Sequence, residues 1–180
     1  GKQQVANWKI EIIASAPEDS DSISRYKVFY QTTRDICKGL IPDISIGGGT
    51  FVFTTNLELE EFFYHKISDC NFDFYSFALF PYSNRLVREK RNFQRITDPD
   101  YLKVQIQMIK NLNLNKPIYI SEWSNTVSRS NLMNDTLYKG TFIIKSLIDI
   151  FDQVDGVGYW LATDLAQKNP HYSALLTGGN

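Results

Sequence analysis

The feature that most constrains the fold is an alternation of short β-rich runs and longer helical segments along the whole chain. Between the β-rich runs, apolar residues recur every three or four positions, as on the buried face of a helix. Strands that alternate with helices predict right-handed βαβ units and a parallel sheet, hence the α/β class. A doubly wound domain and a partial (β/α)8 barrel both fit this pattern. The expected strands are Trp8–Ile13, Asp43–Ile46, Phe72–Phe80, Ile118–Ser121 and Gly156–Ala162.

Start and stop signals divide the remaining segments into four helices. Pro42 ends the first helix, and three glycines, Gly47–Gly49, are expected to end the second strand. The expected helix starts are Ser20 or Asp21, Thr55 with Glu58, Asp98-Pro99, and about Asn134. The expected apolar stripes are Ile23, Tyr26, Tyr30, Thr33 and Cys37; Leu59, Phe62, Phe63 and Ile67; Leu102, Ile106, Ile109 and Leu112; and Leu137, Thr141, Ile144, Leu147, Ile148 and Phe151.

Length and charge exclude several classes of protein. A chain of 180 residues with 43% hydrophobic residues is expected to form one domain, residues 1–180, with its own core. A net charge of −1 argues against a chain whose main role is to bind the phosphates of a nucleic acid. Cys37 and Cys70 form no CxxC pair, which favours a reduced, cytoplasmic setting. No apolar run approaches the ~18 residues of a membrane span.

Neither a cofactor nor a metal ion is predicted. Gly47–Gly49 precedes Thr50 and Phe51 and matches neither common phosphate-binding glycine pattern. His65 and His171 have no second ligand at metal-binding spacing. Aromatic residues make up 14% of the chain, which indicates either a rich core or a site that stacks on sugar rings.

The most informative segment is Lys116–Asn125, KPIYISEWSN. It places a carboxylate, Glu122, where a buried parallel strand stops, and ligands of α/β folds bind beyond the carboxyl ends of the strands. Glu122 can act there as a nucleophile, with Trp123 packed on a sugar face. The alternative is that Glu122 only accepts hydrogen bonds from a neighbouring loop.

The pattern around Glu122 resembles glycoside hydrolase family 39, the β-xylosidase and α-L-iduronidase family. KPIYISEW matches the strand that carries the family's nucleophile, and Tyr159, Trp160, Thr163 and Asp164 match a later YW and S/T-D step. The resemblance runs from about Val5 to Gly179. It implies strands four to eight of a (β/α)8 barrel with outer helices, in a chain that is part of a larger protein whose first three units precede Gly1. Weaker matches lie upstream at Trp8, Glu11, Ile12, Asp73, Phe74 and Ser76.

The departures from the family pattern concern its catalytic and sugar-binding positions. Ser15, or Ala16 with a one-residue gap, stands where the resemblance places the general acid/base Glu, and Glu18 is the nearest substitute. Ala78 and Phe80 stand where the family usually has a His and a Tyr at the sugar site. By the resemblance Glu122 keeps the nucleophile position, and Trp123 and Trp160 are expected sugar contacts.

Three functions follow as hypotheses. The leading one is a non-catalytic domain that binds or senses a sugar or short oligosaccharide, as in the C-terminal parts of AraC-type transcriptional regulators. This context implies that DNA is contacted only through a domain outside this chain. The alternatives are a fragment of a retaining β-xylosidase with a displaced acid, and a purely structural barrel used for dimerisation. Open edges at the strands of Trp8 and Tyr159 lead us to expect pairing between copies.

Overall fold

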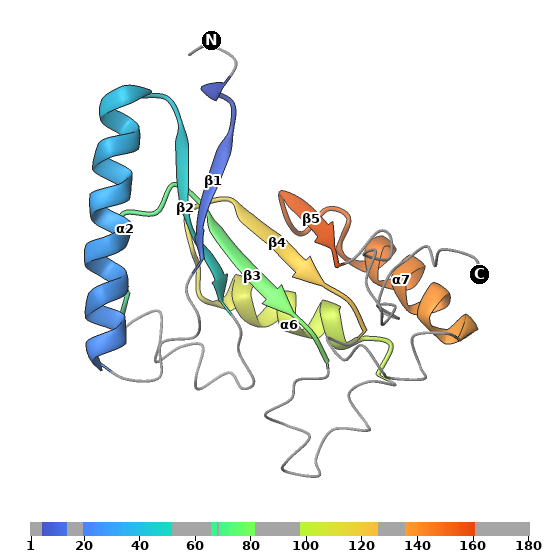
Figure 1. Cartoon of the computed structure of the whole chain (residues 1–180). Helices are drawn as coiled ribbons and strands as arrows, with labels where there is room; N and C mark the ends of the chain where they lie inside the picture. Colours follow the sequence, from blue (N-terminus) through green and yellow to red (C-terminus); the bar gives the residue numbers. More distant parts are fainter. Residues whose placement is uncertain are drawn as a thin grey trace, which may run out of the picture. The chain divides into compact units, whose positions relative to one another are not determined.

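The computed structural model describes residues 5–13, 20–51, 66–67, 69–81, 98–125 and 136–160. Five strands form one parallel sheet in chain order, β1-β2-β3-β4-β5, without the reversal of a doubly wound domain (Figure 1). This confirms the α/β class and the barrel-like order. The elements are β1 (Lys9–Ile13), α2 (Ser20–Leu40), β2 (Ser45–Phe51), β3 (Tyr75–Leu79), α6 (Tyr101–Asn111), β4 (Ile118–Trp123), α7 (Leu137–Ile150) and β5 (Gly156–Tyr159).

The chain forms two compact units. The first comprises residues 1–78 and 109–119, and the second comprises residues 79–108 and 120–180. β1, α2 and β2 belong to the first unit, and α7 and β5 belong to the second. The two units are described separately below.

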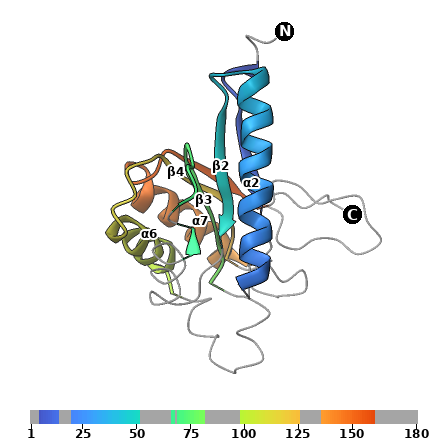
Figure 2. The same ribbon diagram turned by 90° about the vertical axis from the view of Figure 1, so that its left-hand side faces the viewer.

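In the first unit, α2 lies beside β2 and is tied to the sheet by two tyrosines (Figure 2). The Tyr26 hydroxyl donates to the carbonyl oxygen of Ile12 at 3.2 Å, and the Tyr30 hydroxyl to that of Ile46 at 3.1 Å. Both rings are buried, as the helical spacing predicts. Other apolar residues of α2 are exposed, namely Val28, Phe29, Ile36 and Leu40.

The prediction that Gly47–Gly49 ends the second strand is wrong, because all three glycines lie inside β2. β2 pairs with β1 in parallel, from Lys9 opposite Ser45 to Ile13 opposite Gly49. A Cβ atom on Gly47 or Gly48 would collide with the ring of Phe74 or Phe72, respectively. These glycines therefore make room for the rings of Phe74 and Phe72, and they do not form a turn.

In the second unit, α6 begins as predicted. The Asp98 carboxylate accepts a hydrogen bond of 2.9 Å from the Asp100 backbone N–H, and the helix starts at Tyr101. The four predicted apolar positions are buried, namely Leu102 and Ile106 in the second unit and Ile109 and Leu112 in the first.

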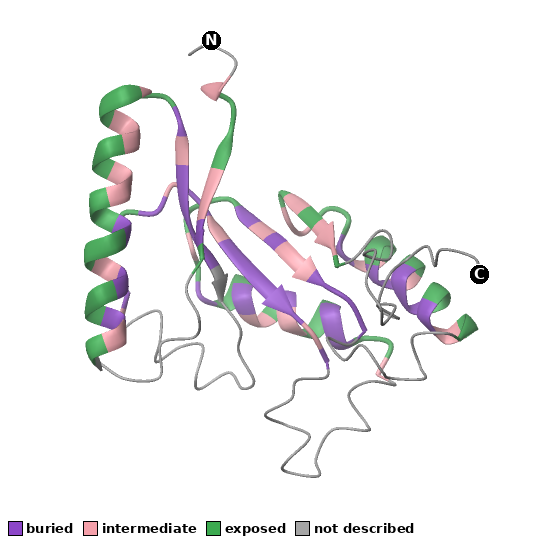
Figure 3. Cartoon of the chain, viewed as in Figure 1, coloured by how far each residue is buried: buried purple, intermediate pink, exposed green. Residues whose placement is uncertain are grey.

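The prediction for α7 is only partly correct. The helix begins at Leu137, and Asn134 lies outside the described residues. Five of the expected apolar positions face solvent, with Leu137 92% and Phe151 87% exposed (Figure 3). The expected helix start at Thr55 and most of that helix also lie outside the described residues. The exposed apolar positions of α7 are Leu137, Ile144, Leu147, Ile148 and Phe151, and the buried positions are Lys139, Phe142, Ile143, Ser146 and Ile150.

None of the helices described is long and apolar enough to cross a membrane.

Candidate functional site

Glu122 is the fifth of the six residues of β4 and lies near the carboxyl end of this strand. Ile118 and Ile120 are buried in alternation with half-buried neighbours, as in a strand whose two faces differ. The alternation shifts at the end of the strand, where Ser121 and Glu122 are both half-buried and Trp123 is buried. The structure thus places the candidate carboxylate at the strand end, with partial access to solvent.

Trp123 is a packed core residue, with only 1% of its surface exposed. Its ring lies edge-on to Tyr159, with ring centroids 5.2 Å apart, and 6.1 Å from Phe142. Packing of this kind holds the end of β4 against β5 and α7. The indole Nε1 is buried and has no hydrogen-bond partner in the structure as described.

A short chain of polar side chains follows Trp123. Ser124 and Asn125 are both fully buried. The Ser124 hydroxyl donates to Asn125 Oδ1 at 3.2 Å and lies 3.4 Å from the hydroxyl oxygen of Tyr159 on β5. Burial raises the pKa of Tyr159, while its hydrogen bond with Ser124 opposes this rise. Of these three residues, only Tyr159 is part of the family resemblance. Ser124 and Asn125 were given no role, although a Ser-Asn pair directly after Glu122 and Trp123 was a usable signal.

β5 approaches β4 closely at Gly158. A Cβ atom on this glycine would lie 2.6 Å from the carbonyl oxygen of Ser121, so only glycine fits. One residue after β5, the backbone N–H of Trp160 donates to the backbone carbonyl oxygen of Trp123 at 2.8 Å. Trp160 is 39% exposed, in contrast to Trp123. Of the two predicted sugar-contacting tryptophans, Trp160 is the one whose side chain is accessible.

The remaining candidate residues lie in or just after β3, or they lie outside the described residues. Ala78 is buried in β3. Phe80 is half-buried just after β3, and its carbonyl oxygen accepts a hydrogen bond of 3.0 Å from the Tyr101 hydroxyl. Ser15, Ala16 and Glu18 lie outside the described residues. The role of Ser15 as the replacement for the acid/base therefore stays a prediction from the sequence.

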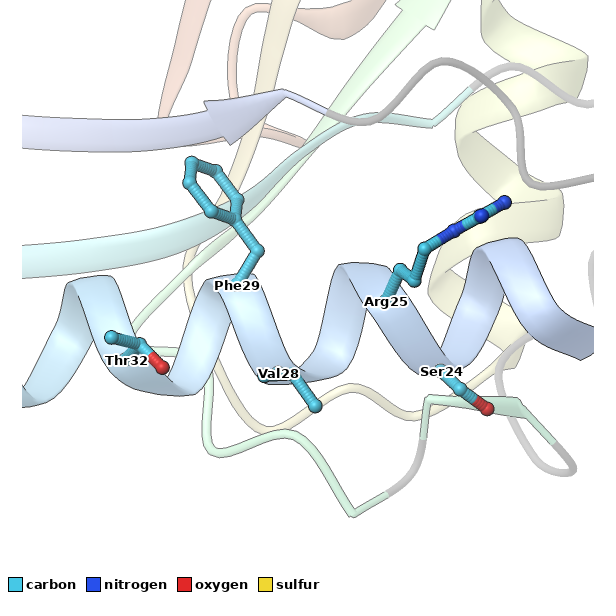
Figure 4. A pocket seen from close by; sticks show the side chains of 5 residues that line it. All are labelled: Ser24, Arg25, Val28, Phe29 and Thr32. Carbon is cyan, nitrogen blue, oxygen red and sulfur yellow. The ribbon is translucent and has the colours of Figure 1, made fainter.

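Among the described residues, an open hollow of about 470 Å³ is lined by side chains of α2, namely Ser24, Arg25, Val28, Phe29 and Thr32 (Figure 4). Ser24 and Thr32 carry hydroxyls, but none of these five residues is a carboxylate or an imidazole that could act as the general base to activate them. Within the described ranges, no group of three or more His, Cys, Asp or Glu side chains could hold a metal ion.

A comparison with protein families matches residues 1–176 to the model of glycosyl hydrolases family 39. The chain belongs to this family. The match covers β1, β5 and all the elements between them, so the strands described above are the family's own framework.

Similar proteins fall into two groups. A β-xylosidase of Caldicellulosiruptor saccharolyticus is 36% identical over 64 residues, which are 35% of this chain and 13% of that protein. An HTH-type transcriptional regulator of Staphylococcus aureus strain MSSA476 is 32% identical over 60 residues, or 33% of this chain and 8% of the regulator. Both matches therefore cover only a small part of a longer protein.

The solved structures agree with the fold. The GH39 enzyme of Xanthomonas axonopodis pv. citri superposes with a TM-score of 0.70 at 18% identity, covering 97% of this chain and 38% of that enzyme. A monomeric β-xylosidase of Caulobacter crescentus gives a TM-score of 0.68 at 15% identity, with 97% and 39% coverage. At these identities the likeness shows the fold, which is that of part of a TIM barrel.

Proposed function

We propose that this chain is a carbohydrate-binding or sensing domain that has lost glycosidase activity. The observation that carries the proposal is a combination within one family member. Glu122 lies near the carboxyl end of β4, while the resemblance in sequence assigns Ser15 or Ala16 to the place of the acid/base. Neither of these two side chains can protonate a leaving group.

The chemistry of the family explains why this loss separates binding from catalysis. A retaining glycosidase needs two carboxyl groups about 5–5.5 Å apart, one as nucleophile and one as proton donor. Loss of general acid catalysis typically removes about 10²–10⁴-fold in rate. Binding needs only a concave site with a few well-placed polar groups and an apolar or aromatic wall. Glu122 and the accessible ring of Trp160 are groups of these two kinds.

The similarity to HTH-type regulators supports a setting in which sugar binding controls transcription. In that setting the domain acts in the cytoplasm, and a separate domain contacts DNA. The net charge of −1 is consistent with this division of labour, because a DNA-binding surface is normally basic. Copies of the chain are then expected to associate, and β1 and β5 are the outer strands of the described sheet.

A retaining β-xylosidase with a displaced acid is the second candidate. The observation in its favour is the 36% identity to the β-xylosidase of Caldicellulosiruptor saccharolyticus. Glu18 would then supply the missing carboxyl group.

The test uses the full-length protein with an aryl β-xyloside and with xylobiose, which has a poor leaving group. We expect calorimetric binding of D-xylose or xylobiose and no hydrolysis of either glycoside. Because Ser15→Glu restores a proton donor at this position, it should raise turnover of xylobiose, and Ser15→Gln, which has a similar size but no acid, should not. Wild-type hydrolysis of xylobiose that is abolished by Glu18→Gln would instead establish the second candidate.

A further inference from the structure

The polar chain beyond β4 joins three side chains. A serine hydroxyl has one proton, and the Ser124 hydroxyl donates it to Asn125 Oδ1 at 3.2 Å. Ser124 Oγ also lies 3.4 Å from the Tyr159 hydroxyl oxygen, a contact in which either hydroxyl can be the donor. Ser124 therefore links the amide oxygen of Asn125 to Tyr159.

The bond from Ser124 determines which end of the Asn125 amide is left over. With Oδ1 engaged by Ser124, the other end of the amide is the Nδ2 group, which carries two N–H donors. Nδ2 is buried and has no hydrogen-bond partner in the structure as described. Asn125 is itself fully buried, so water does not readily compensate these donors.

A second donor in the same segment has the same property. Trp123 Nε1 is buried without a partner, two residues before Asn125. An isolated buried donor is destabilising, and most such groups in native proteins have a partner. Two of them directly after Glu122 indicate that this strand end is completed by an external acceptor.

We propose that the Asn125 amide is a ligand-contacting donor, held in place by the Tyr159 and Ser124 hydroxyls, for a hydroxyl oxygen of a bound sugar. The inference rests on the proposed carbohydrate-binding function and adds a contact that the sequence analysis did not contain. Sugar hydroxyls both donate and accept hydrogen bonds. The Asn125 donor suits the oxygen of such a group, whereas a purely apolar ligand would leave this donor unpaired. Ser124 and Tyr159 act as positioning residues.

The test compares affinities of the full-length protein for D-xylose and xylobiose by isothermal titration calorimetry. Asn125→Asp keeps the size of the side chain and the oxygen that Ser124 contacts, but replaces the donor with an acceptor. We expect affinity to fall at least about tenfold, because an acceptor then faces the sugar oxygen. Ser124→Ala keeps the Asn125 Nδ2 donor but removes the hydrogen bond that orients the amide. The affinity should then fall about two- to tenfold.

Ser146→Ala is the matched control, because Ser146 Oγ on α7 is also buried without a partner. It should leave the affinity unchanged, and circular dichroism confirms that each variant is folded. Equal affinities for wild type and Asn125→Asp would overturn the assignment of Asn125 while the proposed function stands. If the wild type binds neither sugar, the proposed function fails, and this inference fails with it. Should Asn125→Asp not fold, an unchanged affinity in Ser124→Ala overturns the proposed positioning.

Discussion

Lys38 Nζ, in the last turn of α2, lies 2.7 Å from Asp73 Oδ2, just before β3. The same carboxylate oxygen accepts a hydrogen bond of 2.9 Å from the Ile46 N–H, and Arg34 lies 3.8 Å from the other oxygen. Burial alone would raise the pKa of Asp73, but these three partners outweigh it and hold the pKa below its usual value. One side chain thus joins α2, β2 and the start of β3.

We predict that Asp73→Asn lowers the free energy of unfolding by about 1–2 kcal/mol at pH 7. Because the pKa of Asp73 is lowered in the folded state, its contribution is complete above about pH 4 and is lost as pH falls through the folded pKa. Urea unfolding at pH 7 and at lower pH should therefore show the difference from wild type shrinking with acid. Asp35→Asn, at an exposed position of α2, is the control and should change little. A difference independent of pH would contradict the role given to the Asp73 charge.

The glycines of β2 predict a contrast between two identical substitutions. Gly48→Ala places a methyl group against the buried ring of Phe72 and should cost more than about 1 kcal/mol. Gly140→Ala, inside α7, meets nothing within 4 Å and should stabilise the helix by up to about 1 kcal/mol. Thermal unfolding of both variants tests the pair. The explanation of β2 would be wrong if Gly48→Ala were as well tolerated as Gly140→Ala.

The two tryptophans at the candidate site should respond differently to truncation. Trp123→Ala removes a fully packed ring and should cost about 3–5 kcal/mol of stability. Trp160→Ala removes a partly exposed ring, which should cost no more than about 2 kcal/mol and weaken sugar binding several-fold. Urea unfolding and calorimetry measure the two effects. An unchanged sugar affinity in Trp160→Ala would remove Trp160 from the site.

Alkaline conditions should weaken the attachment of α2 to the sheet. Burial raises the pKa of Tyr26 well above its usual value of about 10. A raised pKa in the folded state means that the hydroxyl contributes fully below about pH 10, and that this contribution is lost as pH rises. Tyr26→Phe should cost about 0.5–1.5 kcal/mol at pH 7 and less at pH 11, as measured by urea unfolding. A constant cost at both pH values would contradict this account.

Sequence patterns predicted the elements whose signals are local. The spacing of Ile23, Tyr26 and Tyr30 identified the buried face of α2, and Asp98-Pro99 located the start of α6. Neither depends on distant parts of the chain. The strand order followed from the alternation of strands and helices together with the family resemblance, and the structure confirms it.

The errors arose where tertiary contacts decide. Glycines usually mark turns, and only the rings of Phe72 and Phe74 show why Gly48 and Gly47 lie inside a strand. α7 has apolar residues on two sides, so its spacing could not reveal that Phe142 is buried and Leu137 exposed. The candidate site was also predicted only in part. Its position at the end of β4 was predictable, but the burial of Trp123 depends on residues from α7 and β5.

The sequential strand order also has a consequence during synthesis on the ribosome. Each strand from β2 to β5 neighbours the strand made immediately before it, so a new strand can add to an edge that already exists. The sheet can therefore grow in the direction of translation, and none of the strands from β2 to β5 has to wait for a partner encoded far downstream. Each addition closes a loop of limited length, which keeps its entropic cost modest. Until the next strand emerges, the newest one exposes unpaired backbone groups, which makes the nascent chain vulnerable to association with other chains.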